Sequence, residues 1–438
     1  MTTEIDILIH ARWIVPVEPD GVVHQRYAVA VHDGRIVELL PSDAATARYD
    51  ARETIRLSDH ALIPGLVNAH THAAMSLFRG LADDLPLMEW LQNHIWPAEA
   101  KWVSPDFVRD GTELAVAEML KSGTTCFNDM YFYPEDTARA CLAIGMRAVV
   151  GLILLDFPTG YAQTPDEYLH KGLRVRDDLS ASDLVTTAFA PHAPYTVSND
   201  PLKKLRTLND ELNLPVHMHL HETAHEVDEA VKATGQRPLA RLAELNLLQP
   251  NLMAVHMTQL LESEIETYAK SGASVVHCPE SNLKLASGFC PVHALLRAGV
   301  NVALGTDGAA SNNDLDMLDE MRIAALLAKG VAREATAVPA RTALRMATLN
   351  GARALGLDSR IGSLQPGKAA DFAAIDLSAL ASTPVYDPVS QLVYAAGRDQ
   401  VTDVWVNGRR LLQDRVLTSV DETAVLEKAR RWRDKIGA

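Results

Sequence analysis

The sequence predicts an α/β fold, a (β/α)8 TIM barrel with a small β-sandwich domain formed from both chain ends. Two observations predict this fold class. Eight short apolar runs alternate with amphipathic stretches through the middle of the 438-residue chain, and eight strand–helix units are the count of such a barrel. The two ends instead carry short apolar runs separated by turn residues, which is typical of antiparallel strands.

Each middle run is short enough for one strand and apolar enough to be buried on both faces, as parallel strands are. The eight runs occupy residues 61–70, 123–130, 147–155, 184–192, 215–221, 251–257, 273–279 and 301–307. Helical patterns such as residues 105–123 and 201–214 lie between them. A doubly wound open sheet is the alternative. The barrel is favoured because five of the runs end near a His or Asp, and a barrel gathers all its strand ends at one mouth.

The flanking regions predict a second domain. Residues 4–16 and 27–40 are expected to form antiparallel strands, and the Asn407-Gly408 pair between two apolar runs predicts a hairpin near the C-terminus. The expected domains are residues 1–60 plus 365–420 for the composite β-sandwich, 61–364 for the barrel and 421–438 for a C-terminal helix.

Composition excludes several classes of function. The formal net charge of −15 argues against a nucleic acid partner, which requires clustered Lys and Arg. No basic stretch followed by an apolar run opens the chain, and no apolar run approaches the roughly 20 residues of a membrane span. The four cysteines are scattered, so we expect reduced thiols in a cytoplasmic protein rather than a thiolate metal site.

A metal site is predicted at the ends of the strands. His70 and His72 face the same side of a strand, although such a pair alone is commonly satisfied by backbone carbonyls. At a barrel mouth they would meet His219 and Asp307 from other strand ends, which makes a metal the better interpretation; capping of a helix is the alternative for Asp307. Three imidazoles and one carboxylate favour Zn²⁺, with Fe²⁺ possible. No lysine ends the fourth run to bridge a second ion, so one metal is expected.

The stretch PVHMHLHET contains three histidines at alternate positions. His219 lies at the depth of a ligand, His217 is expected below it as a core residue, and His221 above it in the loop. Glu222, partly shielded beside the metal, would have a raised pKa and could transfer protons. The alternative for Glu222 is an exposed glutamate at the start of a helix.

These motifs resemble the amidohydrolase superfamily. The matching segments are PGLVNAHTH (64–72), HCPESNLKLASG (277–288), GTDGAASNN (305–313) and PGKAADF (366–372). They are similar to the cytosine deaminase/chlorohydrolase-like branch, and most closely to the 5-methylthioadenosine/S-adenosylhomocysteine deaminases. The resemblance covers nearly the whole chain. It implies hydrolytic deamination of a small-molecule adenine nucleoside to its inosine analogue and ammonia, by a homo-oligomer.

The resemblance also implies a role for each site residue. The metal ligands would be His70, His72, His219 and Asp307. Asp307 would also accept a proton from water, Glu222 would transfer protons and contact the substrate, and His256 would polarise the attacked centre. Glu99 matches a carboxylate that holds ribose hydroxyls, and His192 matches a substrate-contacting histidine. From spacing alone, Glu99 would be a helix glutamate and His192 a capping residue.

One departure concerns the amino-acid tail of S-adenosylhomocysteine, which suggests a nearby cation. Residues 156–170, after the third run, contain no Arg or Lys. This favours 5′-methylthioadenosine or adenosine as substrate, unless another loop or a neighbouring subunit supplies the charge. The rival functions are a guanine or pterin deaminase, an s-triazine chlorohydrolase or, in a different class, a non-catalytic barrel that binds ligands.

Overall fold

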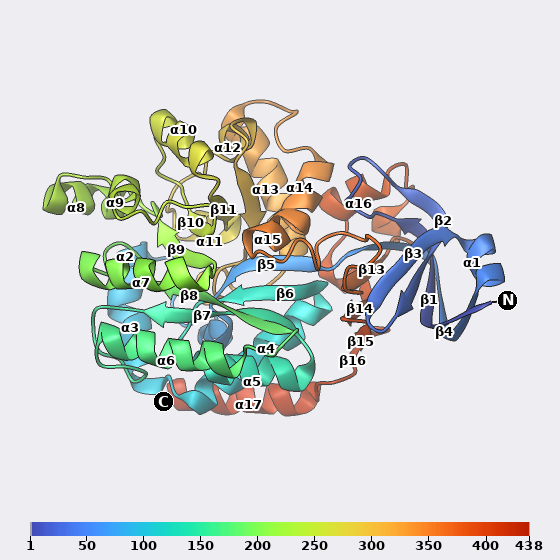
Figure 1. Cartoon of the computed structure of the whole chain (residues 1–438), viewed down its shortest axis with the longest axis horizontal. Helices are drawn as coiled ribbons and strands as arrows, with labels where there is room; N and C mark the ends of the chain where they lie inside the picture. Colours follow the sequence, from blue (N-terminus) through green and yellow to red (C-terminus); the bar gives the residue numbers. More distant parts are fainter. Residues whose placement is uncertain (1, 438) are drawn as a thin grey trace.

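The computed structural model describes residues 2–437 and contains two sheets of eight strands each (Figure 1). One sheet is parallel throughout, with the order β12-β11-β10-β9-β8-β7-β6-β5. Its strands are β5 (Leu66–Thr71), β6 (Thr124–Asp129), β7 (Arg147–Leu154), β8 (Val185–Pro191), β9 (Val216–Leu220), β10 (Leu252–His256), β11 (Ser274–His277) and β12 (Asn301–Leu304). The predicted barrel is confirmed, because strands adjacent in sequence are adjacent in space.

The barrel closes between its first and last strands. The Asn68 side chain holds Thr306 through two hydrogen bonds of 2.7 and 3.0 Å, and the Asp307 amide donates to the His70 carbonyl at 3.0 Å. Glycine at position 305 permits this approach, because the Cβ of any other residue would lie only 2.7 Å from the backbone nitrogen of His70. The seam therefore fixes Asp307 beside His70 at the mouth.

Helices connect the barrel strands. The connection from β5 to β6 contains η1 (Ala73–Phe78), α2 (Leu87–Trp90), η2 (Leu91–Ile95), α3 (Trp96–Trp102) and α4 (Pro105–Lys121). The later helices of the barrel are α5 (Pro134–Ile144), α6 (Pro165–Asp178), α7 (Asn199–Leu212), α8 (Ala224–Thr234), α9 (Pro238–Glu244), α10 (Glu262–Ser271), α11 (Pro279–Lys284), α12 (Val292–Arg297), α13 (Met317–Ala332), α14 (Ala340–Met346) and α15 (Leu349–Ala354). Side chains of Ser104, Thr164 and Thr223 cap α4, α6 and α8, which sets where these helices begin.

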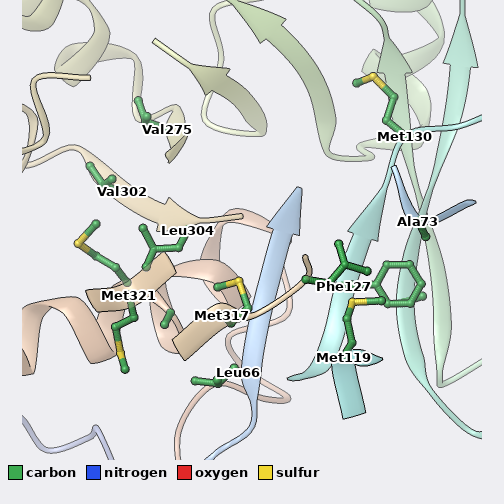
Figure 2. Close-up of a cluster of buried hydrophobic side chains, with 14 of the residues drawn as sticks. Leu66, Ala73, Met119, Phe127, Met130, Val275, Val302, Leu304, Met317 and Met321 are labelled. Atoms are coloured by element: carbon green, nitrogen blue, oxygen red, sulfur yellow. The ribbon is translucent and has the colours of Figure 1, made fainter. Parts of the chain in front are cut away.

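The main core lies between the strands and their helices (Figure 2). Leu66 of β5 and Phe127 of β6 are fully buried, as are Val302 of β12 and Met317 of α13. Fully burying such a side chain contributes about 1.5–3 kcal/mol. The continuous apolar runs in the sequence thus correspond to strands covered on both faces.

Strands from both chain ends form the second sheet, at the right of Figure 1. In spatial order they are β16 (Val416–Leu417), β15 (Arg409–Gln413), β14 (Val401–Val406), β13 (Phe372–Asp376), β4 (Tyr49–Pro64), β1 (Thr3–Ile14), β2 (His24–His32) and β3 (Arg35–Pro41). The predicted β14–β15 hairpin is confirmed: Asn407 and Gly408 have φ of 50° and 77°, as its tight turn requires.

The long strand β4 joins the two halves of this sheet. It pairs in parallel with β1 along most of its length and antiparallel with β13 at its end. Residues 61–64, expected in the first barrel strand, are this end of β4. The break falls at Gly65, where a Cβ would lie 2.0 Å from Thr125 Oγ1. The apolar run at residues 61–70 therefore contributes to both sheets, with its start in β4 and its remainder in β5.

A buried ion pair connects the two sheets. Arg147, at the start of β7, donates to both oxygens of Asp371, which precedes β13, at 2.6 and 3.1 Å. We propose that the sheets mark the two domains expected from sequence, with the first boundary at Gly65 rather than residue 60, because residues 61–64 belong to β4. The remaining helices are α1 (Ser42–Arg48), η3 (Leu380–Ser382), α16 (Pro388–Tyr394), η4 (Arg398–Gln400) and α17 (Glu422–Ile436). Helix α17 lies against α4, where the Trp432 indole donates to Asp110 at 3.0 Å. None of the helices between residues 2 and 437 has the length and apolar character needed to span a membrane.

Candidate active site

Four side chains converge at the barrel mouth, each from the end of a strand or the residues just after it. They are His70, His72, His219 and Asp307, and one ligand-type atom of each lies within 4.8 Å of the others. Asp307 Oδ1 lies 3.1 Å from His70 Nε2 and 3.2 Å from His72 Nε2. His219 Nε2 lies 3.2 Å from His70 Nε2. The structure thus brings together the four residues predicted to hold a metal.

Backbone carbonyls orient two of these rings. His72 Nδ1 lies 2.6 Å from the Met130 carbonyl oxygen, and His219 Nδ1 lies 2.8 Å from that of His192. A carbonyl oxygen only accepts hydrogen bonds, so each Nδ1 carries the hydrogen. When either ring is neutral, its lone pair is therefore on Nε2 and points into the cluster, which is the state that binds a metal ion.

The other two histidines of the PVHMHLHET stretch are buried and differ in what they contact. His217 Nε2 lies 2.8 Å from His70 Nδ1, and its Nδ1 lies 3.0 Å from the Asn128 amide. His217 is the buried, satisfied residue expected from sequence, but one of its partners belongs to the cluster. His221 Nε2 instead accepts a hydrogen bond from the Leu239 backbone amide at 3.1 Å, which stabilises the start of α9.

Asp307 is held by three donors besides the histidines. Its Oδ2 accepts from the Ser281 hydroxyl at 2.7 Å and from the Ser311 hydroxyl at 3.1 Å. Its Oδ1 accepts from the Gly308 amide at 2.8 Å. These contacts fix the plane of the carboxylate.

The carboxyl group of Asp307 is ionised. Burial opposes ionisation, but hydrogen bonds and charge from His70 and His72 hold its pKa well below the usual value. The alternative role as a helix cap does not apply, since the next helix, α13, is capped by Asp316. An ionised carboxylate among imidazole nitrogens is a suitable ligand set for a divalent cation.

Glu222 lies beside this cluster and is only 5% exposed. Burial, reinforced by the negative charge of Asp307, raises its pKa to about 8. The following helix starts after Thr223, so Glu222 precedes the helix and lines a cavity. Its backbone amide donates to the Glu226 carboxylate at 2.7 Å, which fixes the strand-to-helix turn. A neutral carboxyl in this position can donate a proton near neutral pH.

His256, at the end of β10, lies between two polar groups. Its Nδ1 lies 2.8 Å from the Asn282 amide oxygen, and its Nε2 lies 3.8 Å from Glu222 Oε2. The backbone of His256 has φ of 75°, a conformation unusual outside glycine that recurs at functional sites. The ring thus presents Nε2 to the same cavity as Glu222.

The cavity has a volume of about 520 Å³ and extends outward from the cluster. Glu99 of α3 and His192 line it together with Glu222 and His256. Desolvation raises the pKa of Glu99 to about 7, with Tyr131 and His72 partly offsetting the effect. The aromatic side chains of its wall are Trp90, Trp96, Tyr131, Phe132, Tyr133, Phe157, Tyr161 and Tyr195. The site residues predicted from sequence therefore line one cavity, with the exception of His70, which is fully buried.

Residues that support the site were missed in the sequence. Ser281 and Asn282 lie inside the quoted segment HCPESNLKLASG, yet no role followed from the pattern. Glu226 has the spacing of an N3 residue after Thr223, a signal for a helix start that could have indicated its contact with the turn. Asn128 is fully buried at the end of β6, and no repeat or spacing marks it.

A parallel barrel with imidazole and carboxylate groups converging at its mouth is an arrangement suited to a metal-dependent hydrolase. The chain belongs to the amidohydrolase family, whose model matches residues 61–411. The predicted family is confirmed, and with it the prediction of an enzyme.

Relatives are similar over the full length. A protein of Saccharophagus degradans named 5-methylthioadenosine/S-adenosylhomocysteine deaminase is 53% identical, covering 100% of this chain and 98% of its own. The crystal structure of an adenosine deaminase from Xanthomonas campestris with bound zinc is 55% identical, with a TM-score of 0.99 and 100% of both chains covered. An atrazine chlorohydrolase from Arthrobacter aurescens shares the fold at 22% identity, with a TM-score of 0.90 over 97% of this chain and 99% of that one.

Proposed function

We propose that this enzyme hydrolytically deaminates an adenine nucleoside, 5′-methylthioadenosine or adenosine, to its inosine analogue and ammonia. The observation that carries the proposal is the position of Glu222, a carboxyl with a pKa of about 8 that shares a cavity with the His–Asp cluster. The names of the full-length relatives support the same reaction.

One Zn²⁺ ion fits the ligand set, and Fe²⁺ would accept the same donors. The residues proposed to hold it are His70, His72, His219 and Asp307, whose ligand-type atoms cluster at the mouth. The fit is supported by the Nδ1–carbonyl hydrogen bonds, which leave Nε2 of His72 and His219 free to coordinate. When bound, the ion supplies Lewis-acid activation of water near neutral pH.

The proton transfers are assigned to residues of this chain. Asp307 accepts a proton from the attacking water. Its low pKa keeps the carboxylate deprotonated beforehand, and the water becomes acidic as its oxygen bonds to C6. Glu222 donates its proton to ring N1 as water attacks C6, which makes the ring electrophilic. We assign His256 to polarising the attacking water, because its Nε2 lies 3.8 Å from Glu222 Oε2 in the same cavity and can accept a hydrogen bond. Asp307 then passes its proton to the amino group, which leaves as ammonia, and the C6 hydroxyl returns a proton to Glu222 as it becomes the carbonyl of the product.

Glu99 and His192 are assigned to substrate binding. A carboxylate in the wall of the cavity can accept hydrogen bonds from both ribose hydroxyls. His192 Nδ1 lies 3.0 Å from Thr196 Oγ1, so the ring is held in place beside the cluster. The sugar would thus lie between α3 and the strand ends, with the adenine ring deeper in the cavity.

The test is ammonia release by zinc-loaded protein from adenosine, 5′-methylthioadenosine, S-adenosylhomocysteine and guanine. The proposal predicts turnover of adenine nucleosides and none of guanine. Turnover of guanine alone would favour a rival deaminase, and binding of a nucleoside without ammonia release would favour a non-catalytic barrel.

We further propose that the enzyme acts in a reducing compartment, the cytoplasm, as a homo-oligomer. The first part is supported by the four cysteines, which are unpaired and buried. The oligomeric state stays a prediction that sedimentation of the purified protein tests.

A further inference from the structure

We propose that the outer half of the cavity selects adenine nucleosides with an uncharged, apolar 5′ substituent and discriminates against a zwitterionic amino-acid tail. The inference rests on the proposed function and concerns the same cavity. It assigns this chain a narrower substrate class than the double name of its relatives, which includes S-adenosylhomocysteine.

The place of the 5′ substituent follows from the sugar. Glu99, assigned to the ribose, lies on α3, and Trp96 lies three residues earlier on the same face of that helix. The ring of Trp96 faces that of Phe157 from the loop after β7, with 6.5 Å between ring centroids and 58° between planes. A group that leaves the ribose away from the base therefore meets these two aromatic rings.

The wall offers no positive counter-charge to a carboxylate. Within residues 2–437, the side chains that line the cavity include no Lys and no Arg. Its acidic members are Glu99, Glu222 and Asp307. The apolar and aromatic residues of the wall include Val103, Phe132, Tyr133, Leu155, Pro158 and Tyr161. A carboxylate here would lose hydration without gaining an ion pair, which is strongly unfavourable.

Three cations close to the wall already make contacts with other groups. Lys171 lies behind Tyr161, with its ammonium 5.2 Å from the centre of that ring and 2.8 Å from Glu167. Lys284 pairs with Asp83 at 2.5 Å. Arg241 donates to the carbonyls of Pro194 and Val197 at 2.6 and 2.8 Å. Turning any of these cations toward the cavity would break contacts that it already makes.

The loop that carries Phe157 is fixed by its own hydrogen bonds. The Thr159 amide donates to the Ala162 carbonyl at 2.8 Å, and the Gln163 side chain donates to the Thr159 carbonyl at 2.7 Å. The Thr159 hydroxyl lies 2.6 Å from that of Tyr168 on α6. The aromatic wall is therefore preformed, and it offers a methylthio group both apolar burial and sulfur–aromatic contact.

The experiment compares kcat/KM of the zinc-loaded full-length protein for three nucleosides. These are 5′-methylthioadenosine, 5′-butylthioadenosine and S-adenosylhomocysteine, the last two having tails of similar length that differ in charge. We expect the two neutral substrates to agree within about tenfold and S-adenosylhomocysteine to be lower by about 100-fold or more. Equal values for the two long tails would overturn the inference, and so would rejection of both, since size would then decide. Failure to deaminate any of the three would instead contradict the proposed function.

A pair of variants tests the electrostatic cause. Phe157 is 40% exposed, so Phe157→Arg can place a guanidinium at the wall, and Phe157→Leu is the matched control for loss of the ring. We expect Phe157→Arg to raise the ratio of S-adenosylhomocysteine to 5′-butylthioadenosine turnover about tenfold or more, and Phe157→Leu to leave that ratio unchanged. If Phe157→Arg does not fold, Gln163→Arg supplies the charge from an exposed wall position. A folded arginine variant with an unchanged ratio would contradict the inference.

Discussion

His256 Nδ1 lies 2.8 Å from the side-chain amide oxygen of Asn282, and this hydrogen bond holds the imidazole ring in place. Because this oxygen accepts, Nδ1 carries the hydrogen and the lone pair of the neutral ring lies on Nε2, which faces the cavity. Asn282 is itself buried and lies within the short helix α11. A residue outside the cavity thus sets the orientation of a predicted catalytic ring.

Asn282→Ala is expected to reduce kcat by about 10- to 100-fold, the usual effect of losing a partner that orients a functional histidine. KM and zinc content should change little, because Asn282 contacts neither substrate nor the ligand cluster. Steady-state kinetics and metal analysis of the purified variant check this. Asn282→Asp, which keeps an acceptor oxygen, should recover most of the rate; equal losses in both variants would contradict an orienting role.

Glu222→Gln is expected to retain zinc and lose about 10²–10⁴-fold in kcat, because the amide cannot supply the proton for ring N1. Ammonia release and metal content are measured on the same sample. Glu229→Gln, an exposed change on the adjoining helix α8, is the control and should behave like the wild type. Retention of rapid turnover by Glu222→Gln would contradict the assigned role.

The same carboxyl should make the metal-free protein less stable as pH rises. The pKa of Glu222 is about 8 in the folded state and 4.5 in its ordinary state, so between these values the folded chain keeps a proton that the unfolded chain has lost. The free energy of unfolding then falls with increasing pH across this window. After chelation, the Tm of Glu222→Gln minus that of the wild type should be smallest near pH 4.5 and grow by several degrees up to pH 9. A difference independent of pH would contradict the shifted pKa.

Glu99→Gln is expected to lower kcat/KM for adenine nucleosides by about 10- to 100-fold, the value of one or two charge-assisted hydrogen bonds to the ribose. Activity toward free adenine, which has no ribose, should change little relative to the wild type. Glu89→Gln, on the exposed side of α2, is the control. Equal losses on adenosine and adenine would show that Glu99 acts elsewhere than on the sugar.

The residues at the strand ends could be predicted from sequence, because side chains alternate along a strand and strands and helices alternate along the chain. Alternation placed His70 and His72 on one face, and the barrel count placed Asp307 at the last strand. The closing seam between Asn68 and Thr306 then brings Asp307 beside His70, a contact that any closed barrel of this order requires. Fold class and cluster therefore follow from the same pattern.

The supporting contacts could not be predicted in this way. Ser281 and Asn282 reach Asp307 and His256 only because the short helix α11 turns back over the mouth. The apposition of Trp96 and Phe157 depends on how the β5–β6 connection places helix α3 and on the conformation of the loop after β7, and no sequence period predicts either. Loop geometry is set by many weak local contacts, so the spacing of residues in the sequence does not predict which side chains these residues contact.

The most direct test of the central claim is anomalous diffraction at the zinc edge from crystals of catalytically active protein. The claim predicts one zinc peak per chain, about 2.0–2.2 Å from the coordinating atoms of the His70, His72, His219 and Asp307 side chains, and loss of both the peak and ammonia release in Asp307→Ala. A peak at another site, or undiminished deamination by protein stripped of metal, would contradict it.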